Sequence, residues 1–143
     1  MPERPVKTIV ASQKPFTLPA QTTVSEAARL MTQRNASAAM VLEGAGLVGI
    51  FTERDALFRV LAQGRDPQTT HLADVMTPNP QTIDSDKSFR YALILMYERG
   101  FRHLPVVENG KPIGMVCATD ALNPELQEVA SDLDVREHIR EII

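Results

Sequence analysis

The stretch GIFTERDAL at residues 49–57 recurs 65 residues later as GMVCATDAL at residues 114–122. Both copies begin with glycine and end with Asp-Ala-Leu. The same offset, without a gap, brings further identical residues into register: Thr17 with Thr82, Ala27 with Ala92, Leu30 with Leu95, Met31 with Met96, Arg34 with Arg99 and Val41 with Val106. Self-similarity at a fixed period indicates one structural unit present twice. Two like units predict a pseudo-twofold fold with two related clefts between its halves.

Length, charge and composition exclude several classes of protein. The 143 residues suffice for one compact domain shared by the two units. The net charge of −3 and the lack of a Lys/Arg stripe argue against general affinity for nucleic acid or anionic lipid. No apolar run approaches the roughly 18 residues of a membrane span, and no signal-peptide pattern follows the first residues, so we expect a cytoplasmic protein. One cysteine and three scattered histidines predict neither a disulfide framework nor a metal site.

Each unit has the pattern strand, helix, strand, strand, helix. In the first unit, a strand at 16–18 precedes a helix that a capping-box pattern starts at Thr23 and that ends near Asn35. Strands at 38–42 and 47–51 follow, and a second helix at 53–63 ends at a glycine. The second unit repeats this pattern with a helix through Phe89 and Met96 and strands at 103–107 and 113–117. Asn-Gly between those strands is a strong hairpin signal.

These patterns divide the chain into five segments. Residues 1–14 form an N-terminal segment, 15–64 the first repeat and 65–79 a mainly polar linker. Residues 80–123 form the second repeat and 124–143 a C-terminal helical tail, because apolar residues from Leu126 to Leu133 share one helix face.

The repeated phrase Gly, two apolar residues, Thr or Cys, two residues and Asp lies where a strand passes into a helix. Its glycine lets the backbone approach a ligand, and the helix N-terminus offers N–H groups and a positive dipole end to a phosphate. An aspartate on the first helical turn can accept two hydrogen bonds from a cis-diol. A single copy is more typical of an ordinary helix cap. Two copies at equivalent places favour a site for a nucleoside phosphate.

Several motifs stand in a fixed order between Phe16 and Leu122. They are Thr-Val-Ser-Glu-Ala at 23–27, Asp-Val-Met-Thr at 74–77, Phe-Arg-His-Leu-Pro-Val-Val at 101–107 and the two glycine phrases. In this order and spacing the chain resembles the CBS-domain family in its stand-alone tandem-pair form, the Bateman module. The resemblance implies an α+β fold in which two tandem β-α-β-β-α repeats pack sheet against sheet as one pseudo-twofold module. It also implies that two such modules form a disc-shaped homodimer.

The resemblance implies a function as well. Family members bind adenosine-containing ligands such as AMP, ADP, ATP, NAD(H) or S-adenosylmethionine between the repeats and regulate another protein or domain. We therefore expect a non-catalytic energy or ligand sensor that requires no cofactor, with the ligand as effector and a regulated protein still unknown. One alternative is a nucleotide-independent dimeric scaffold or interaction protein with degenerate pockets. An enzyme is disfavoured because no paired carboxylates, nucleophile with base, or metal cluster fall in the expected clefts.

The first nucleotide cleft that the resemblance implies combines the phrase of the first repeat with the strand start of the second. Arginine and histidine there would neutralise phosphate through charge-assisted hydrogen bonds; the alternative is that both are solvated residues at a strand start. The expected residues are Ile50, Thr52, Arg54, Asp55, Met76, Thr77, Pro78, Phe101, Arg102 and His103.

The second implied cleft is the weaker of the two in this interpretation. Cys117 replaces the hydroxyl of the phrase, and Ser37 and Ala38 stand where the first cleft has its arginine and histidine. The expected residues are Phe16, Ser37, Ala38, Met115, Thr119 and Asp120. Cys117 itself is interpreted as a small buried strand residue rather than a redox centre.

The first helices of the two repeats differ in a way that predicts an interface. Residues 91–97 are apolar nearly all round, whereas Arg29 and Thr32 interrupt the equivalent helix of the first repeat. A helix that is apolar on every side must be covered on every side. We therefore expect Ile94 and Tyr97 to pack across the twofold axis of a homodimer.

Overall fold

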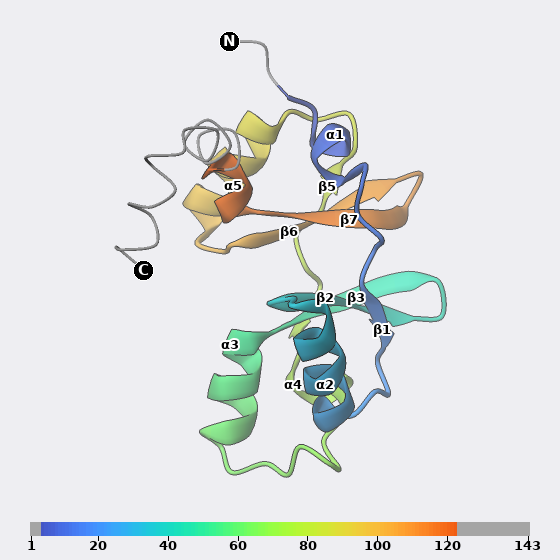
Figure 1. The fold of residues 1–143 in the computed structure, drawn as a ribbon, viewed down its shortest axis with the longest axis vertical. Helices are drawn as coiled ribbons and strands as arrows, with labels where there is room; N and C mark the ends of the chain where they lie inside the picture. Colours follow the sequence, from blue (N-terminus) through green and yellow to red (C-terminus); the bar gives the residue numbers. More distant parts are fainter. Residues whose placement is uncertain (1–3, 123–143) are drawn as a thin grey trace, which may run out of the picture.

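The computed structural model describes residues 4–122, which form an α+β fold with two sheets (Figure 1). The first sheet contains, in spatial order, β1 (Thr17–Pro19), β2 (Ala38–Glu43), β3 (Gly46–Thr52) and β4 (Thr77–Pro78). The second contains β5 (Ile83–Asp84), β6 (His103–Glu108) and β7 (Lys111–Cys117). The two sheets face each other in the middle of the molecule, and the helices cover their outer faces (Figure 1). The predicted sheet-against-sheet arrangement is thus confirmed.

The helix predicted from the capping box is α2 (Val24–Arg34). The Thr23 Oγ1 atom accepts a hydrogen bond from the Glu26 N–H at 3.2 Å, and Asn35 ends the helix in the left-handed region at φ 50°. The second helix of this repeat is shorter than predicted. It consists of α3 (Glu53–Asp55) and a π-helical turn, η1 (Ala56–Leu61).

The second repeat follows the same plan. Its first helix is α5 (Phe89–Arg99), which the Ser88 hydroxyl caps and Gly100 ends at φ 76°. The predicted hairpin turn joins β6 to β7, with Asn109 and Gly110 both at positive φ, as a type I′ turn requires. A short 3₁₀ helix, η2 (Ala118–Leu122), follows β7. The predicted C-terminal helical tail lies outside the described residues.

Two short helices cross between the repeats. Helix α1 (Val6–Val10) precedes the first repeat in the sequence, yet Val6 and Val10 are buried in the core of the second. Helix α4 (Leu72–Val75), from the segment between the repeats, is buried in the core of the first. Each core is therefore completed by the segment that precedes the other repeat. The sequence analysis predicts no helix in either segment, because only tertiary burial stabilises helices this short.

The core consists of two clusters, one between each sheet and its helices. Met31 and Met96, at equivalent places in the repeats, are both buried, as their helical spacing predicts. The largest fully buried side chains are Phe51, Met40, Leu72, Leu104, Val6, Val41, Val75, Val106, Val116 and Pro105. Within residues 4–122, the helices are all too short or too polar to span a membrane.

Candidate functional site

The glycine phrase of the first repeat ends in a reciprocal helix cap. The Thr52 Oγ1 atom accepts a hydrogen bond from the Asp55 N–H at 3.1 Å, and the Asp55 Oδ2 atom accepts one from the Thr52 N–H at 3.0 Å. Asp55 is only 6% exposed. A carboxylate this buried needs partners for its remaining lone pairs.

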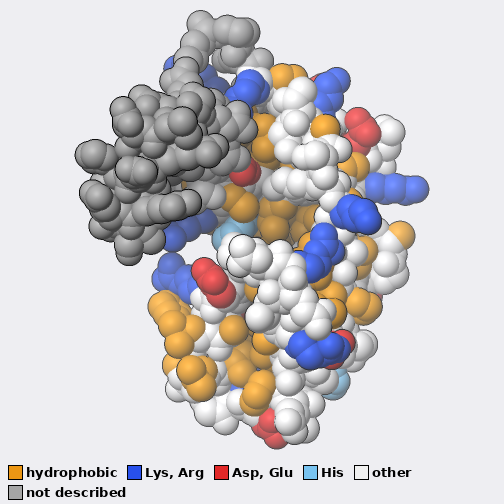
Figure 2. Space-filling model, in the orientation of Figure 1, with side chains coloured by type: hydrophobic (Ala, Val, Ile, Leu, Met, Phe, Trp, Pro, Cys, Tyr) orange, Lys and Arg blue, Asp and Glu red, His pale blue; other side chains and the backbone are white. Residues whose placement is uncertain are grey.

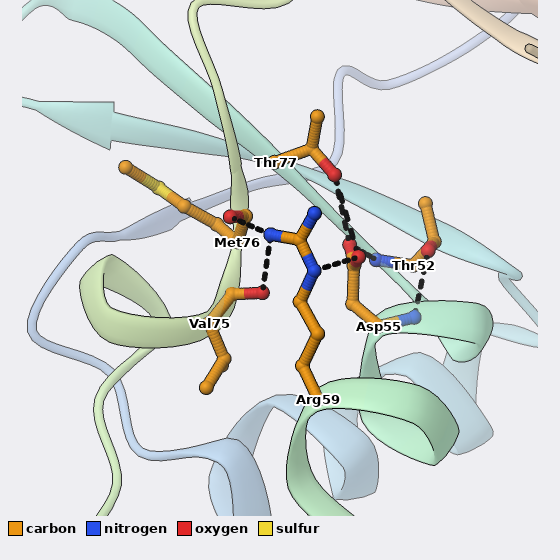
Figure 3. Close-up of polar contacts among 6 residues, drawn as sticks. All are labelled: Thr52, Asp55, Arg59, Val75, Met76 and Thr77. Carbon is orange, nitrogen blue, oxygen red and sulfur yellow. Dashed lines mark hydrogen bonds and ion pairs between the residues drawn. The ribbon is translucent and has the colours of Figure 1, made fainter.

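Those partners come from the same chain (Figure 3). The Thr77 hydroxyl donates to Asp55 Oδ1 at 3.3 Å, and Arg59 Nε lies 3.5 Å from the same oxygen. The Arg59 guanidinium also donates through Nη1 to the carbonyl oxygen of Met76 at 2.7 Å and reaches that of Val75 at 3.5 Å. Both oxygens of the Asp55 carboxylate are thus occupied without any ligand.

In the second repeat, the Asp120 carboxylate accepts the same kind of backbone hydrogen bond as Asp55, but it has fewer partners among residues 4–122. The Asp120 Oδ2 atom accepts a hydrogen bond from the Cys117 N–H at 2.7 Å. Cys117 stands where Thr52 stands in the first repeat, so the hydroxyl of the cap is missing. Among residues 4–122, Asp120 makes no other side-chain hydrogen bond or ion pair, and it is only partly buried.

The glycines of the two phrases make room for the chain itself. A Cβ atom at Gly49 would lie 2.9 Å from the carbonyl oxygen of Thr77, and one at Gly114 would lie 2.6 Å from the Cβ atom of Val10. Both distances are far inside van der Waals contact. The expectation that these glycines let a ligand approach is therefore wrong, because crossing segments already fill that space.

The crossing segments bind the two sheets by different means. In the first repeat, β4 pairs with β3 through the backbone, with Thr77 opposite Ile50. In the second, the side-chain amide of Gln13 takes that role at Met115, which is equivalent to Ile50. Gln13 Nε2 donates to the Met115 carbonyl and Gln13 Oε1 accepts from the Met115 N–H, both at 3.1 Å.

A cleft of about 410 Å³ lies beside this second arrangement. It is lined by both repeats and by the segment that crosses between them. Figure 2 shows a hollow between the two halves of the molecule, with apolar side chains in it and Lys or Arg side chains at its edge. The lining residues are Gln13, Lys14, Phe16, Arg34, Asn35, Ala36, Ser37, Ala38, Met40, His103, Met115 and Cys117. Four of the residues expected in the second site therefore lie together: Phe16, Ser37, Ala38 and Met115.

The cations of this cleft were missed by the sequence analysis. Neither Lys14 nor Arg34 is among the site residues that the sequence predicts. In the structure the Arg34 guanidinium lies 4.5 Å from the centre of the Phe16 ring and donates to the Lys14 carbonyl at 3.1 Å. The position of Arg34 at the end of a helix, 18 residues from an aromatic residue in the sequence, gave no signal of this contact.

His103 lies between the two repeats and contacts Ser37 of the first. Its Nε2 atom is 3.0 Å from the Ser37 Oγ atom, and its ring lines the cleft beside Cys117. Burial lowers the pKa of His103, and the charge of Arg102 adds to this, while Glu53 and Asp120 act in the opposite direction.

The other residues expected in the first site are only partly brought together. Thr52, Asp55, Met76 and Thr77 lie side by side (Figure 3). Ile50 is buried in β3, and Pro78 is exposed in β4. The Arg54 guanidinium lies 4.7 Å from the centre of the Phe58 ring. Phe101 packs against the core of the second repeat, and Arg102, next to His103 in the sequence, is exposed. Thr119 of the second site is exposed on η2.

Arg59 is the contact of Asp55 that sequence reasoning missed. Its spacing of four residues from Asp55 was the available signal, because side chains at i and i+4 meet on one helix face.

Cys117 is a poor nucleophile in this environment. Burial, together with the nearby charge of Asp120, raises the pKa of its thiol to about 11. Among residues 4–122, the structure brings no three His, Cys, Asp or Glu side chains together in a way that would hold a metal ion.

Comparison with known sequences connects both repeats to one family. The sequence matches the CBS domain over residues 6–62 and 72–124. A CBS domain-containing protein of Arabidopsis thaliana is 41% identical over 121 residues, which make up 84% of this chain and 22% of that protein. A protein of Methanopyrus kandleri is 35% identical over 114 residues, or 79% of this chain and 58% of that protein. The chain thus spans about a fifth of the length of the Arabidopsis relative.

Comparison with solved structures gives the same fold. A CBS-domain containing protein from Agrobacterium tumefaciens has a TM-score of 0.76 at 26% identity, over 85% of this chain and 98% of that one. The CBS domain pair of protein MJ0100 has a TM-score of 0.77 at 26% identity, over 89% and 99% of the two chains. That pair was crystallised in complex with 5′-methylthioadenosine and S-adenosyl-L-methionine.

Proposed function

This chain belongs to the CBS-domain family, and we propose that it is a non-catalytic regulatory module that binds an adenosine-containing ligand between its two repeats. The single observation that carries this proposal is the cleft of about 410 Å³ that Cys117 lines, because the Cys117 N–H is the one hydrogen-bond partner of the Asp120 carboxylate among residues 4–122. Its volume falls in the usual range of small-molecule sites. The adenosine ligands of the MJ0100 domain pair support the same ligand class.

The proposed site reverses the expected order of the two clefts. Asp55, expected to be the stronger acceptor, has both oxygens engaged by Thr77, Arg59 and the Thr52 N–H. Asp120 is more accessible and stands at the helix start beside Cys117, which lines the open cleft. In this proposal the ribose diol binds at Asp120, since a free carboxylate oxygen is the better acceptor.

The lining of the cleft supports a ligand that is apolar at one end and negatively charged at the other. Ala38, Met40 and Met115 offer apolar surface for a base, whereas Lys14 and Arg34 offer positive charge. Arginine and lysine at one edge suit a phosphate group. Of the expected ligands, AMP, ADP, ATP and NAD(H) fit this edge better than S-adenosylmethionine, whose sulfonium is positive. The change on ligand binding would be sensed by a regulated protein.

A thermal-shift series tests the proposal. Adenosine, AMP, ADP, ATP, NAD⁺, NADH and S-adenosylmethionine are compared with GMP as the control for the base. A ligand at a hundred times its Kd stabilises the folded chain by about 2.7 kcal/mol, which raises the Tm by several degrees. We expect this shift for AMP and a smaller one for adenosine. A shift with GMP equal to that with AMP, or no shift with any adenosine ligand, would contradict the proposal.

We further propose a homodimer formed through α5. Ile94 and Tyr97 are 44% and 90% exposed on this helix, so they face away from their own sheet as expected. At the equivalent places of α2, Arg29 pairs with Glu26 and the Thr32 hydroxyl donates to the Ala28 carbonyl. Of these two equivalent helices, α5 is the one with an apolar outer face, and a second copy of this face would cover it.

Light scattering during size-exclusion chromatography tests the dimer. The wild-type chain should elute as a dimer at micromolar concentration, and Ile94→Glu together with Tyr97→Glu should give a monomer. Lys111→Glu changes the surface charge in the exposed hairpin and should leave the dimer intact. A wild-type monomer would refute this interface. A dimer that binds none of the adenosine ligands would favour the alternative function, a nucleotide-independent scaffold.

A further inference from the structure

We propose that Arg59 is a latch that withholds the Asp55 carboxylate from ligand, so that the module binds one ligand at Asp120 and a second only when Arg59 is released. This inference rests on the proposed function. It adds a residue that decides whether the Asp55 carboxylate is available to a ligand.

The latch consists of one guanidinium that joins three acceptors from two elements. Arg59 extends from η1, pairs with Asp55 at 3.5 Å and donates to the carbonyl oxygens that follow α4 (Figure 3). The planar fork of arginine suits this bridging, because its donors point in several fixed directions. A diol that approaches Asp55 would have to displace Arg59 from the Asp55 Oδ1 atom and compete with the Thr77 hydroxyl.

The backbone around Arg59 is unusual. Residues Ala56–Leu61 form a π-helical turn, in which the Ala62 N–H donates to the Leu57 carbonyl five residues earlier. Such turns are rare and occur frequently at functional sites. Here the turn carries Arg59, the side chain that contacts the Asp55 carboxylate.

In sequence, the second repeat has no arginine at the position equivalent to Arg59. The residue 65 positions after Arg59 is Pro124, which has no donor or charge in its side chain. The phrase around Asp120 also lacks the threonine hydroxyl of the first cap. The two repeats thus differ in sequence at residue 59 and its counterpart 124, and at residue 52 and its counterpart 117.

Arg59 has space in which to move. Its side chain is 48% exposed, and it lines a surface hollow of about 440 Å³ together with Phe58, Gln63, Arg65, Asp74 and Val75. Asp74 offers a second carboxylate in this hollow. Because the Arg59 side of the pair is half exposed, a ligand or a partner that attracts the guanidinium outwards can draw it away from the buried Asp55 carboxylate.

Titration calorimetry with AMP, on the full chain, tests the latch through the stoichiometry. Wild-type protein should bind one AMP per chain in the accessible concentration range. Arg59→Met should bind a second AMP at least tenfold more tightly than wild type does. This second site should disappear in Arg59→Met with Asp55→Asn and remain in Arg59→Met with Asp120→Asn. Arg29→Met, which removes an arginine paired with Glu26 on α2, should keep the wild-type stoichiometry.

The outcomes separate the latch from the proposed function. If wild type and Arg59→Met both bind one AMP that depends on Asp120, the latch is wrong and the proposed function stands. If wild type binds two AMP with equal affinity, the latch is also wrong. If neither protein binds AMP or any other adenosine ligand, the proposed function fails and the latch fails with it. Should Arg59→Met not fold, Arg59→Lys decides: its single ammonium cannot bridge all three acceptors, and it should bind the second AMP more tightly than wild type.

Discussion

The two repeats carry the same phrase, yet the structure completes it in opposite ways. In the first repeat, the Thr52 N–H, the Thr77 hydroxyl and Arg59 contact the two oxygens of the buried Asp55 carboxylate. In the second, the Cys117 N–H is the one hydrogen-bond partner of the Asp120 carboxylate among residues 4–122, and Cys117 lines a cleft of about 410 Å³. A shared motif therefore fixes the backbone of a site but not its availability. Residues outside the motif decide whether a ligand can reach the carboxylate.

The crossing segments show the same contrast. One sheet gains a backbone-paired strand, β4, whereas the other gains only the side-chain amide of Gln13. A side chain is easier to displace than a strand, because its release does not break a backbone ladder. The second cleft is therefore also the one whose wall can adapt to a ligand.

The largest expected effect concerns the reactivity of Cys117, which stands in the place of Thr52. Its pKa of about 11 lies some two units above an ordinary thiol, so its thiolate fraction at pH 8 should be roughly a hundredfold smaller. Labelling of native protein by a thiol reagent should be slower than labelling of the urea-unfolded chain by about that factor. Equal rates would show that the cleft around Cys117 is not as apolar as described.

The next comparison is between the two glycines of the phrases. Gly114→Ala should destabilise the fold by about 2–3 kcal/mol, because the new methyl group meets the Cβ atom of Val10. Gly49→Ala should cost a similar amount, because the Met76 side chain can move but the backbone carbonyl of Thr77, 2.9 Å from the new Cβ atom, cannot. Urea unfolding measures both. A loss well below about 1 kcal/mol in either variant would show that the crossing segment there can move away.

The two caps give a pair of opposite substitutions. Thr52→Ala should lower the free energy of unfolding by about 1 kcal/mol, because it removes the acceptor for the Asp55 N–H. Cys117→Thr should raise it by roughly 0.5–1 kcal/mol, because it supplies the missing hydroxyl to η2. Thermal unfolding of both variants checks this. If Cys117→Thr destabilises the protein, a threonine hydroxyl at residue 117 does not cap η2 as the Thr52 hydroxyl caps α3.

The smallest expected effect is a pH dependence from His103. Its folded-state pKa is lower than in the unfolded chain, so the unfolded chain takes up the proton first as the pH falls. Stability should therefore be complete above the unfolded pKa of about 6.5 and decrease as the pH falls from there through the folded pKa. Thermal unfolding between pH 7.5 and 5 should show a smaller decrease in His103→Gln, which keeps a polar partner for Ser37. An identical pH profile for both proteins would contradict the buried position of His103.

Much of the fold could be predicted because it depends on local signals. The capping residue Thr23, the Asn109-Gly110 turn and the spacing of Met31 and Met96 each act within a few residues. The repeat then transferred each signal from one half to the other. Helices α1 and α4 could not be predicted, because burial in the opposite repeat stabilises them and no local pattern marks it.

The site was only partly predictable for a related reason. The phrase identifies Asp55 and Asp120 correctly as helix-start carboxylates. It does not reveal that Arg59 and Thr77 contact the Asp55 carboxylate. Nor does it reveal that Lys14 and Arg34 line the same cleft as Cys117. These contacts join segments whose approach is set by the crossing of the chain. Comparison of the two phrases by residue type alone therefore could not show which carboxylate has more partners in the structure.

The central claim is that the accessible aspartate, and not the saturated one, holds the ligand, and calorimetric titration of AMP into two matched variants tests it most directly. Asp120→Asn should lose a charged acceptor for the ribose diol, which corresponds to about 1.5–3 kcal/mol or a tenfold to hundredfold weaker affinity. Asp55→Asn, at the equivalent position of the first repeat, should bind AMP within about twofold of wild type. The reverse result, a large loss in Asp55→Asn and none in Asp120→Asn, would contradict the account.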